Sequence, residues 1–193
     1  MSASIRHEGS SKFGADHKWG TFPAVSIGWN LKEESFLKNV NFLSFLKLRA
    51  GYGITGTIPG NPYLSLNTLD LGGYGYYGGQ WTTLLRASSN PNPDLRWEKK
   101  KETNIGLDFA FFNDRISGSI DWYNRDTDDL IWDYTVSVPP YVKNTITANA
   151  GSIRNRGLEV SLNFIPVKTK SFTWDTGINF STNTNELVSL SNG

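Results

Sequence analysis

One segment of the chain carries the letters of a phosphate-binding loop. Residues Gly51–Gly56 read GYGITG and match G-x-G-x-x-G, the glycine pattern that holds a dinucleotide pyrophosphate. That chemistry requires the glycines to leave a strand and open a helix. Here they lie inside an alternating run, and the following Thr57–Pro62 segment cannot form a helix. We therefore interpret these glycines as residues that keep a strand face flat or admit a neighbouring element.

The carboxylates offer little further chemistry. Asp126, Asp128 and Asp129 form an acidic cluster that could bind Ca²⁺, but the EF-hand spacing and its distal Glu are missing. We interpret the cluster as solvated charge at a point where a strand emerges into a loop. Glu33 and Glu34 imitate a catalytic pair, yet adjacent residues do not face one site on a regular element.

No metal, cofactor or catalytic grouping is predicted. His7 and His17 are the only histidines, and they lie ten residues apart without a cluster of other ligands. Cysteine is absent, which excludes disulfides and thiolate metal sites. No Ser–His–Asp arrangement can be argued. The sequence therefore predicts a protein that is not an enzyme.

A glycine- and tyrosine-rich segment is the best candidate for ligand contact. Glycines in Gly72–Trp81 supply bends, and the aromatic rings supply flat faces that can stack on sugar rings or peptide groups. The candidate ligand-binding residues are Tyr74, Tyr76, Tyr77 and Trp81. The alternative is that these rings pack the loop against its neighbours or a partner protein.

The elements that must carry these residues are predicted by alternation with a period of two. Such alternation indicates strands with one apolar and one polar face. Most segments run about ten residues, the length that a tilted strand needs to cross a bilayer, whereas strands in soluble proteins average about five or six. The predicted strands are Ser2–Glu8, Gly20–Asn30, Phe45–Thr55, Trp97–Phe112, Ile116–Asp128, Ile153–Ile165 and Ser171–Leu187.

The two faces of these strands differ sharply in chemistry. A Lys or Arg facing lipid at mid-bilayer costs about 2–4 kcal/mol, so the charged residues must face a lumen or lie near a membrane boundary. The residues predicted to face the lumen are Lys47, Arg49, Asp108, Glu159 and Asp175. Those predicted to face lipid are Val25, Ile27, Trp29, Leu48, Ile105, Leu107, Phe109, Val160, Leu162, Trp174 and Phe180. Small and charged inward positions favour a wide lumen.

Connections between the strands are expected to alternate between long and short. The loops that begin at Gly9, Gly56 and Trp132 are expected on one side, and the connectors that begin at Leu31, Asn113 and Pro166 on the other. Outer-membrane barrels show this alternation between outer loops and inner turns. Within the Leu31 connector, the early carboxylates predict one short helix at Glu33–Lys38.

Composition agrees with a membrane barrel wall. Aromatic residues make up 13% of the chain and there are 19 Gly, which suits aromatic girdles and tight turns. The mean hydropathy of −0.39 averages two opposed faces. A formal net charge of +1 gives no basic footprint for nucleic acid. About seven strands, with no signal peptide and no terminal aromatic strand, predict that residues 1–193 are a partial barrel domain.

Several segments of the chain form specific motifs. The most specific is Asn92–Glu98 (NPDLRWE), followed by Asn104–Phe109 (NIGLDF). The remaining motifs, in chain order, are Arg6–Gly14, Gly20–Pro23, Leu46–Gly53, Asn113–Ile116, Asp121–Arg125, Asp129–Ile131 and Asn149–Glu159. In these segments, which cover nearly the whole chain, the sequence resembles the SusC/RagA-type TonB-dependent outer-membrane transporters.

The resemblance implies a function and partners that the residues alone do not give. It implies a 22-stranded barrel in the bacterial outer membrane, filled by an N-terminal plug that this chain lacks. Such transporters import glycans or oligopeptides, coupled to the TonB complex through that N-terminal part. A SusD-like surface lipoprotein forms their lid, and outer-membrane lipid surrounds them.

Two other functions remain open at this point. A soluble carbohydrate-binding β-sandwich would bury the aromatic stripes against a second sheet and use the loop tyrosines as a sugar platform. A non-transporting outer-membrane barrel, such as an adhesin or structural protein, would share the strands but not the transport.

Overall fold

The computed structural model describes residues 1–190, which form strands and one short 3-10 helix, η1 (Leu31–Glu33). The strands are β1 (Ser2–Gly9), β2 (Trp19–Asn30), β3 (Leu43–Thr57), β4 (Leu69–Tyr77), β5 (Gln80–Ala87), β6 (Glu98–Phe111), β7 (Ile116–Asp128), β8 (Ile131–Thr135), β9 (Thr145–Asn149), β10 (Ser152–Lys168) and β11 (Thr173–Ser189). In this part of the chain no helix is long and apolar enough to span a membrane.

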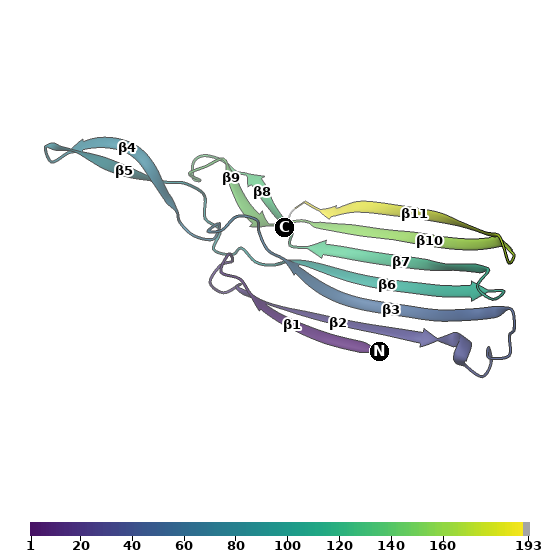
Figure 1. Ribbon diagram of the computed structural model, residues 1–193. Helices are drawn as coiled ribbons and strands as arrows, with labels where there is room; N and C mark the ends of the chain where they lie inside the picture. The colour runs from purple at the N-terminus through teal and green to yellow at the C-terminus, as the bar shows by residue number, and fades with distance from the viewer. Residues whose placement is uncertain (191–193) are drawn as a thin grey trace.

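Seven strands form one antiparallel sheet in the order β1-β2-β3-β6-β7-β10-β11 (Figure 1). These are the seven strands predicted from the sequence, with bounds that differ by a few residues at most. The longest, β10 and β11, have 17 residues each, well beyond the usual strand of about five or six. The sheet is open, because β1 and β11 each pair on one side only.

The register pairs apolar residues with apolar residues on neighbouring strands, so the sheet has one continuous apolar face and one continuous polar face. One row of paired residues crosses six strands on the apolar face: Trp29, Leu48, Leu107, Ile120, Val160 and Phe180. The register places all eleven predicted lipid-facing residues on this apolar face and all five predicted lumen-facing residues on the polar face. A slip of one residue in any pair would turn that strand over.

Within residues 1–190, no second sheet covers the apolar face. Trp29 is 47% exposed and Phe180 is 59% exposed. The other two sheets are the ribbons β4–β5 and β8–β9, and both extend beyond the end of the large sheet rather than over it (Figure 1). The β-sandwich alternative is therefore wrong, since its apolar faces would be buried between two layers.

The connections fall at the two ends of the sheet as predicted. The segments that begin after β1, β3 and β7 lie at one end, which we call the rim, and those that begin after β2, β6 and β10 lie at the other, which we call the turn end (Figure 1). The lengths do not alternate strictly, because the β2–β3 connector (residues 31–42) is longer than the β1–β2 loop (residues 10–18). The sequence did not predict that the two longest rim segments contain ribbons. Tyr77 and Gln80 close β4–β5 through Gly78 and Gly79, whose φ angles of +59° and +84° suit a type I′ turn.

The prediction of a helix at Glu33–Lys38 is wrong. Only η1 forms a helix in this connector, and it ends at Glu33. The next residues form single turns, in which Leu37 and Lys38 both donate their backbone N–H to the Glu34 carbonyl at 3.0 and 2.8 Å. Lys32 accounts for the compact path, because its Nζ donates to the carbonyls of Leu37, Lys38 and Val40.

Candidate functional site: the polar face and the rim

An ion-pair network ties three strands together on the polar face. Arg49 on β3 donates through Nε and a terminal nitrogen to both oxygens of Asp108 on β6, at 2.7 and 2.8 Å. The same guanidinium reaches Asp121 on β7 at 2.9 Å. Bidentate pairs of this kind fix geometry as well as charge.

Gly106 makes this bridge possible. It lies between Arg49 and Asp121 in the register, so the guanidinium crosses directly above it. A Cβ at position 106 would lie 2.4 Å from Asp121 Oδ1 and 2.7 Å from the Arg49 nitrogen. The glycine therefore leaves room for a side chain that spans a whole strand.

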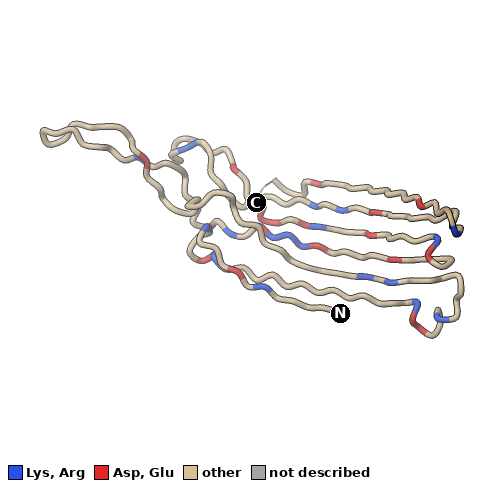
Figure 2. Tube along the Cα trace, in the orientation of Figure 1, with Lys and Arg blue, Asp and Glu red and all other residues tan. Residues whose placement is uncertain are grey.

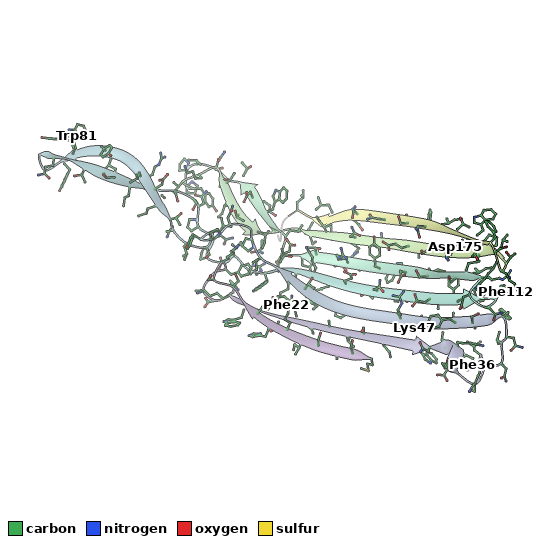
Figure 3. The ribbon with its side chains drawn as sticks, in the orientation of Figure 1. Phe22, Phe36, Lys47, Trp81, Phe112 and Asp175 are labelled. Atoms are coloured by element: carbon green, nitrogen blue, oxygen red, sulfur yellow. The ribbon has the colours of Figure 1, made fainter. Side chains whose placement is uncertain are left out.

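The other predicted polar-face residues flank this network. Lys47 lies opposite Asp108, and Glu159 lies opposite Asp121. Within residues 1–190, Glu159 has no ion pair, and it lines a shallow depression with Ser161 and its neighbours. Asp175 lies near the turn end, where the side-chain amide of Asn163, oriented with its nitrogen toward the carboxylate, donates to it at 2.8 Å (Figure 3). The face thus presents charges of both signs to its surroundings.

The acidic residues near the rim are each paired with a basic side chain. Asp126 accepts from Arg154 Nε at 2.6 Å, and Asp128 accepts from Lys101 Nζ at 2.8 Å. Asp129 accepts from Arg96 at 2.7 Å. Each carboxylate has its own cation, and the side chains of Asp126, Asp128 and Asp129 are 32%, 41% and 23% exposed, so they form separate ion pairs that remain partly solvated.

A small buried core lies at the rim, in a region where the alternation of the sequence does not predict one. Phe13, Phe22, Leu95 and Trp97 come from three separate segments and are almost completely buried. The Trp97 ring lies 4.8 Å from that of Phe13 and 5.2 Å from that of Phe22. The apolar Leu and Trp within the NPDLRWE motif were the available signal. This core explains the motif as a structural anchor for the loops.

Asparagine side chains complete the anchor. Asn90 accepts backbone N–H groups of Val142 and Lys143 and donates to the carbonyls of Lys143 and Thr145. Asn149 accepts from the Arg96 N–H at 2.8 Å and donates to the Arg96 carbonyl at 2.7 Å.

The charged side chain of Arg96 adds an ion pair to the backbone contact between Arg96 and Asn149. The Arg96 guanidinium donates to Asp129, and this hydrogen bond raises the pKa of Arg96 above its usual value despite partial burial. The long β3–β6 segment and the β8–β9 ribbon are therefore held as one unit.

The aromatic candidates lie far from the polar-face network. They belong to the β4–β5 ribbon, whose tip carries Trp81 at the opposite end of the molecule from Lys47 (Figure 3). Trp81 is 72% exposed and Tyr77 is 84% exposed. The Tyr76 and Trp81 rings meet edge to face at 5.5 Å. The structure thus leaves these rings free for contact but does not gather them around a pocket.

A bulge aligns apolar residues along one side of the ribbon. Leu71 pairs with Leu85 and Gly73 pairs with Leu84, so Gly72 is an extra residue in β4. Gly73 has a φ of +109°, which favours glycine. After the bulge the register puts one stripe on a single face of the ribbon: Leu69, Leu71, Tyr74, Tyr76, Trp81 and Leu85.

The other sequence candidates are structural. Gly51–Gly56 lies wholly within β3, as expected, and a Cβ at Gly56 would meet the Phe22 ring at 2.3 Å. His7 stacks on Trp19 with ring centroids 5.0 Å apart. Across residues 1–190, no group of three or more His, Cys, Asp or Glu side chains is placed to hold a metal ion.

The open antiparallel wall, with one apolar and one charged face, defines the class of protein. The family model described as "TonB dependent receptor-like, beta-barrel" matches residues 1–192. The chain therefore belongs to this family of TonB-dependent receptors.

Curated relatives and solved structures agree. The chain is 44% identical to the TonB-dependent receptor SusC of Bacteroides thetaiotaomicron and 40% identical to the TonB-dependent receptor P39 of Formosa agariphila. Each alignment covers 98% of this chain but only 19% and 18% of the relative. The structure of the RagAB peptide importer in the closed-closed state superposes with a TM-score of 0.87 at 29% identity, over 99% of this chain and 20% of that chain. The chain thus spans about a fifth of these proteins.

Proposed function

We propose that this chain forms part of the wall of an outer-membrane nutrient importer. In this role the apolar face contacts lipid and the polar face lines the lumen. The rim lies outside the cell and the turn end lies in the periplasm. The single observation that carries the proposal is the unbroken apolar row across six strands, opposite a face that carries the charges.

The height of the apolar band supports a membrane location. On β10 the outward residues are apolar from Leu158 to Val167, about 30 Å along the strand. At the 35–45° tilt of outer-membrane barrels, this length corresponds to about 22–25 Å of membrane depth. The next outward residue toward the rim is Arg156, which pairs with Glu186 at 3.7 Å. Outer-membrane barrels have an apolar band about 25 Å tall.

The partners follow from the family. The full-length receptor would couple to the TonB complex through an N-terminal part, carry a SusD-like lipoprotein as its lid, and import glycans or oligopeptides. The similarity to SusC and to the RagAB peptide importer supports this class of importer. The family makes the alternative of a non-transporting barrel the weaker proposal.

The ribbon rings supply the cargo contact in this proposal. Tyr74, Tyr76, Tyr77 and Trp81 present flat, exposed faces beyond the rim, where a glycan or peptide would first meet the receptor. Stacking on such rings tolerates a range of sugars or peptide groups.

Growth and uptake in a deletion strain test the function. A strain that lacks the full-length receptor should lose growth on some glycans or on an oligopeptide mixture as sole nutrient, and the intact gene should restore it. Restoration by a Tyr76→Ala, Trp81→Ala double variant should be weaker at limiting nutrient concentration. Phe36→Ala, an exposed aromatic residue at the turn end, is the matched control (Figure 3). Unchanged growth of the deletion strain on every nutrient would contradict the importer.

A further inference from the structure

A groove lies at the turn end of the sheet, away from the network and the rim. It has a volume of about 440 Å³, and its walls come from the β6–β7 turn, the end of β10 and the start of β11. Ile116, Phe164 and Thr176 are consecutive cross-strand partners on the apolar face. The groove therefore continues the proposed lipid-contacting surface to its edge.

Local irregularity in β10 opens this groove. The β10–β11 register shifts between Phe164 and Val167, so Ile165 and Pro166 have no regular partners. Pro166 has no N–H to restore the ladder, and Thr176 is the smallest side chain of its row. A depression thus remains between bulky neighbours.

Aromatic residues place the groove at the depth of lipid headgroups. The rings of Phe42 and Phe111 stack 6.2 Å apart, and the ring of Phe112 lies 6.2 Å from that of Phe42. Phe112 itself lines the groove. In membrane barrels such aromatic girdles mark the boundary between hydrocarbon and headgroups.

A cation lies at the edge of the groove. Arg115 lines it and is exposed, and within residues 1–190 its guanidinium has no carboxylate partner within ion-pair distance. Lys168 ends β10 and Lys170 lies on the adjacent β10–β11 turn, and basic residues are marked in blue at this end of the sheet (Figure 2). Asp114 and Asp175 are the acidic residues nearest in sequence, and Asp175 belongs to the polar face.

We propose that this groove binds one glycerophospholipid of the periplasmic leaflet. The acyl chain lies against Ile116 and Phe164, and the phosphate pairs with Arg115. The apolar floor, the girdle depth and the unpaired cation together match that ligand, since Arg is well suited to phosphate. The proposal rests on the lipid-facing orientation given under the proposed function.

Native mass spectrometry of the full-length receptor tests this site. The receptor is extracted from nanodiscs of phosphatidylethanolamine and phosphatidylglycerol, and retained phospholipids are counted. Arg115→Gln should lower retention of one lipid about fivefold, the effect of one basic residue near an anionic lipid surface. Thr176→Trp should lower it similarly by filling the groove while leaving the charge. Arg86→Gln, an exposed cation on β5 at the far end, should match the wild type.

The outcomes separate this site from the importer itself. Wild-type retention in either Arg115→Gln or Thr176→Trp would overturn the lipid site. Uptake is measured in the same variants and should be unchanged, because Arg115 lies outside the polar-face network. Absence of uptake in the wild type would refute the importer while the lipid counts still report on the groove.

Discussion

Leu95→Ala should loosen the rim while leaving the wall intact. Leu95 is fully buried among Phe13, Phe22 and Trp97. Truncation of a buried Leu to Ala costs about 2–5 kcal/mol, with the larger values where the cavity cannot collapse. Here collapse is restrained, because the Leu95 carbonyl accepts from Gly14 at 3.0 Å and its N–H donates to Asn92 at 3.2 Å. We therefore expect about 3–4 kcal/mol, within that range.

The loss should be confined to the loops. Leu95 precedes β6 and takes no part in the ladder that joins the seven strands. Protease added to whole cells should cut the variant receptor within residues 10–18 or 58–97 much faster than the wild type, whereas heat-modifiable migration on gels stays unchanged. Leu85→Ala, at 62% exposed in the ribbon, is the control and should behave as wild type. Equal protease resistance of the two variants would refute the role of the rim core.

Three further predictions concern the wall. Val160→Arg should reduce assembly of the full-length barrel, because it places a charge in hydrocarbon at a cost of about 2–4 kcal/mol. Ser161→Arg is the control and should assemble nearly normally. Equal heat-modifiable migration of the two variants on gels would argue against the face assignment. Single cysteines at Tyr76 and Asn113 should differ in intact cells, with position 76 labelled by an impermeant maleimide and position 113 protected; the reverse would invert the orientation. Residues 1–193 expressed alone should aggregate or require detergent, because two edges and an apolar face are unpartnered; a monomeric scattering peak with one thermal transition would contradict this.

The wall could be predicted from the sequence because its signal is local and repeated. Alternation places Leu48, Leu107 and Val160 on one face whatever the partner strands are, and the cost of a charge in hydrocarbon is the reason we propose that the other face contacts water. Because neighbouring strands are antiparallel, successive connections then fall at alternate ends of the sheet. Each strand carries this information independently, so errors of a few residues at the ends do not matter.

The rim and the pairings could not be predicted in the same way. Arg49 can reach both Asp108 and Asp121 only because of the register across three strands and the space above Gly106. The core of Phe13, Leu95 and Trp97 joins residues more than 80 positions apart in a region without periodicity. The expected helix does not form because the Lys32 side chain donates to carbonyls five, six and eight residues further along the chain, and helix propensities do not describe such contacts.

The orientation of the two faces is the central claim, and one pair of residues tests it directly. This chain contains no cysteine, so Val160→Cys and Ser161→Cys can each carry a bimane label in the full-length receptor, with any cysteine elsewhere in it replaced. In nanodiscs of brominated phospholipid, the label at 160 should be quenched and the label at 161 should not, while aqueous iodide should do the opposite. Equal quenching at both positions, or lipid quenching at 161 alone, would contradict a wall with lipid on its apolar face and water on its polar face.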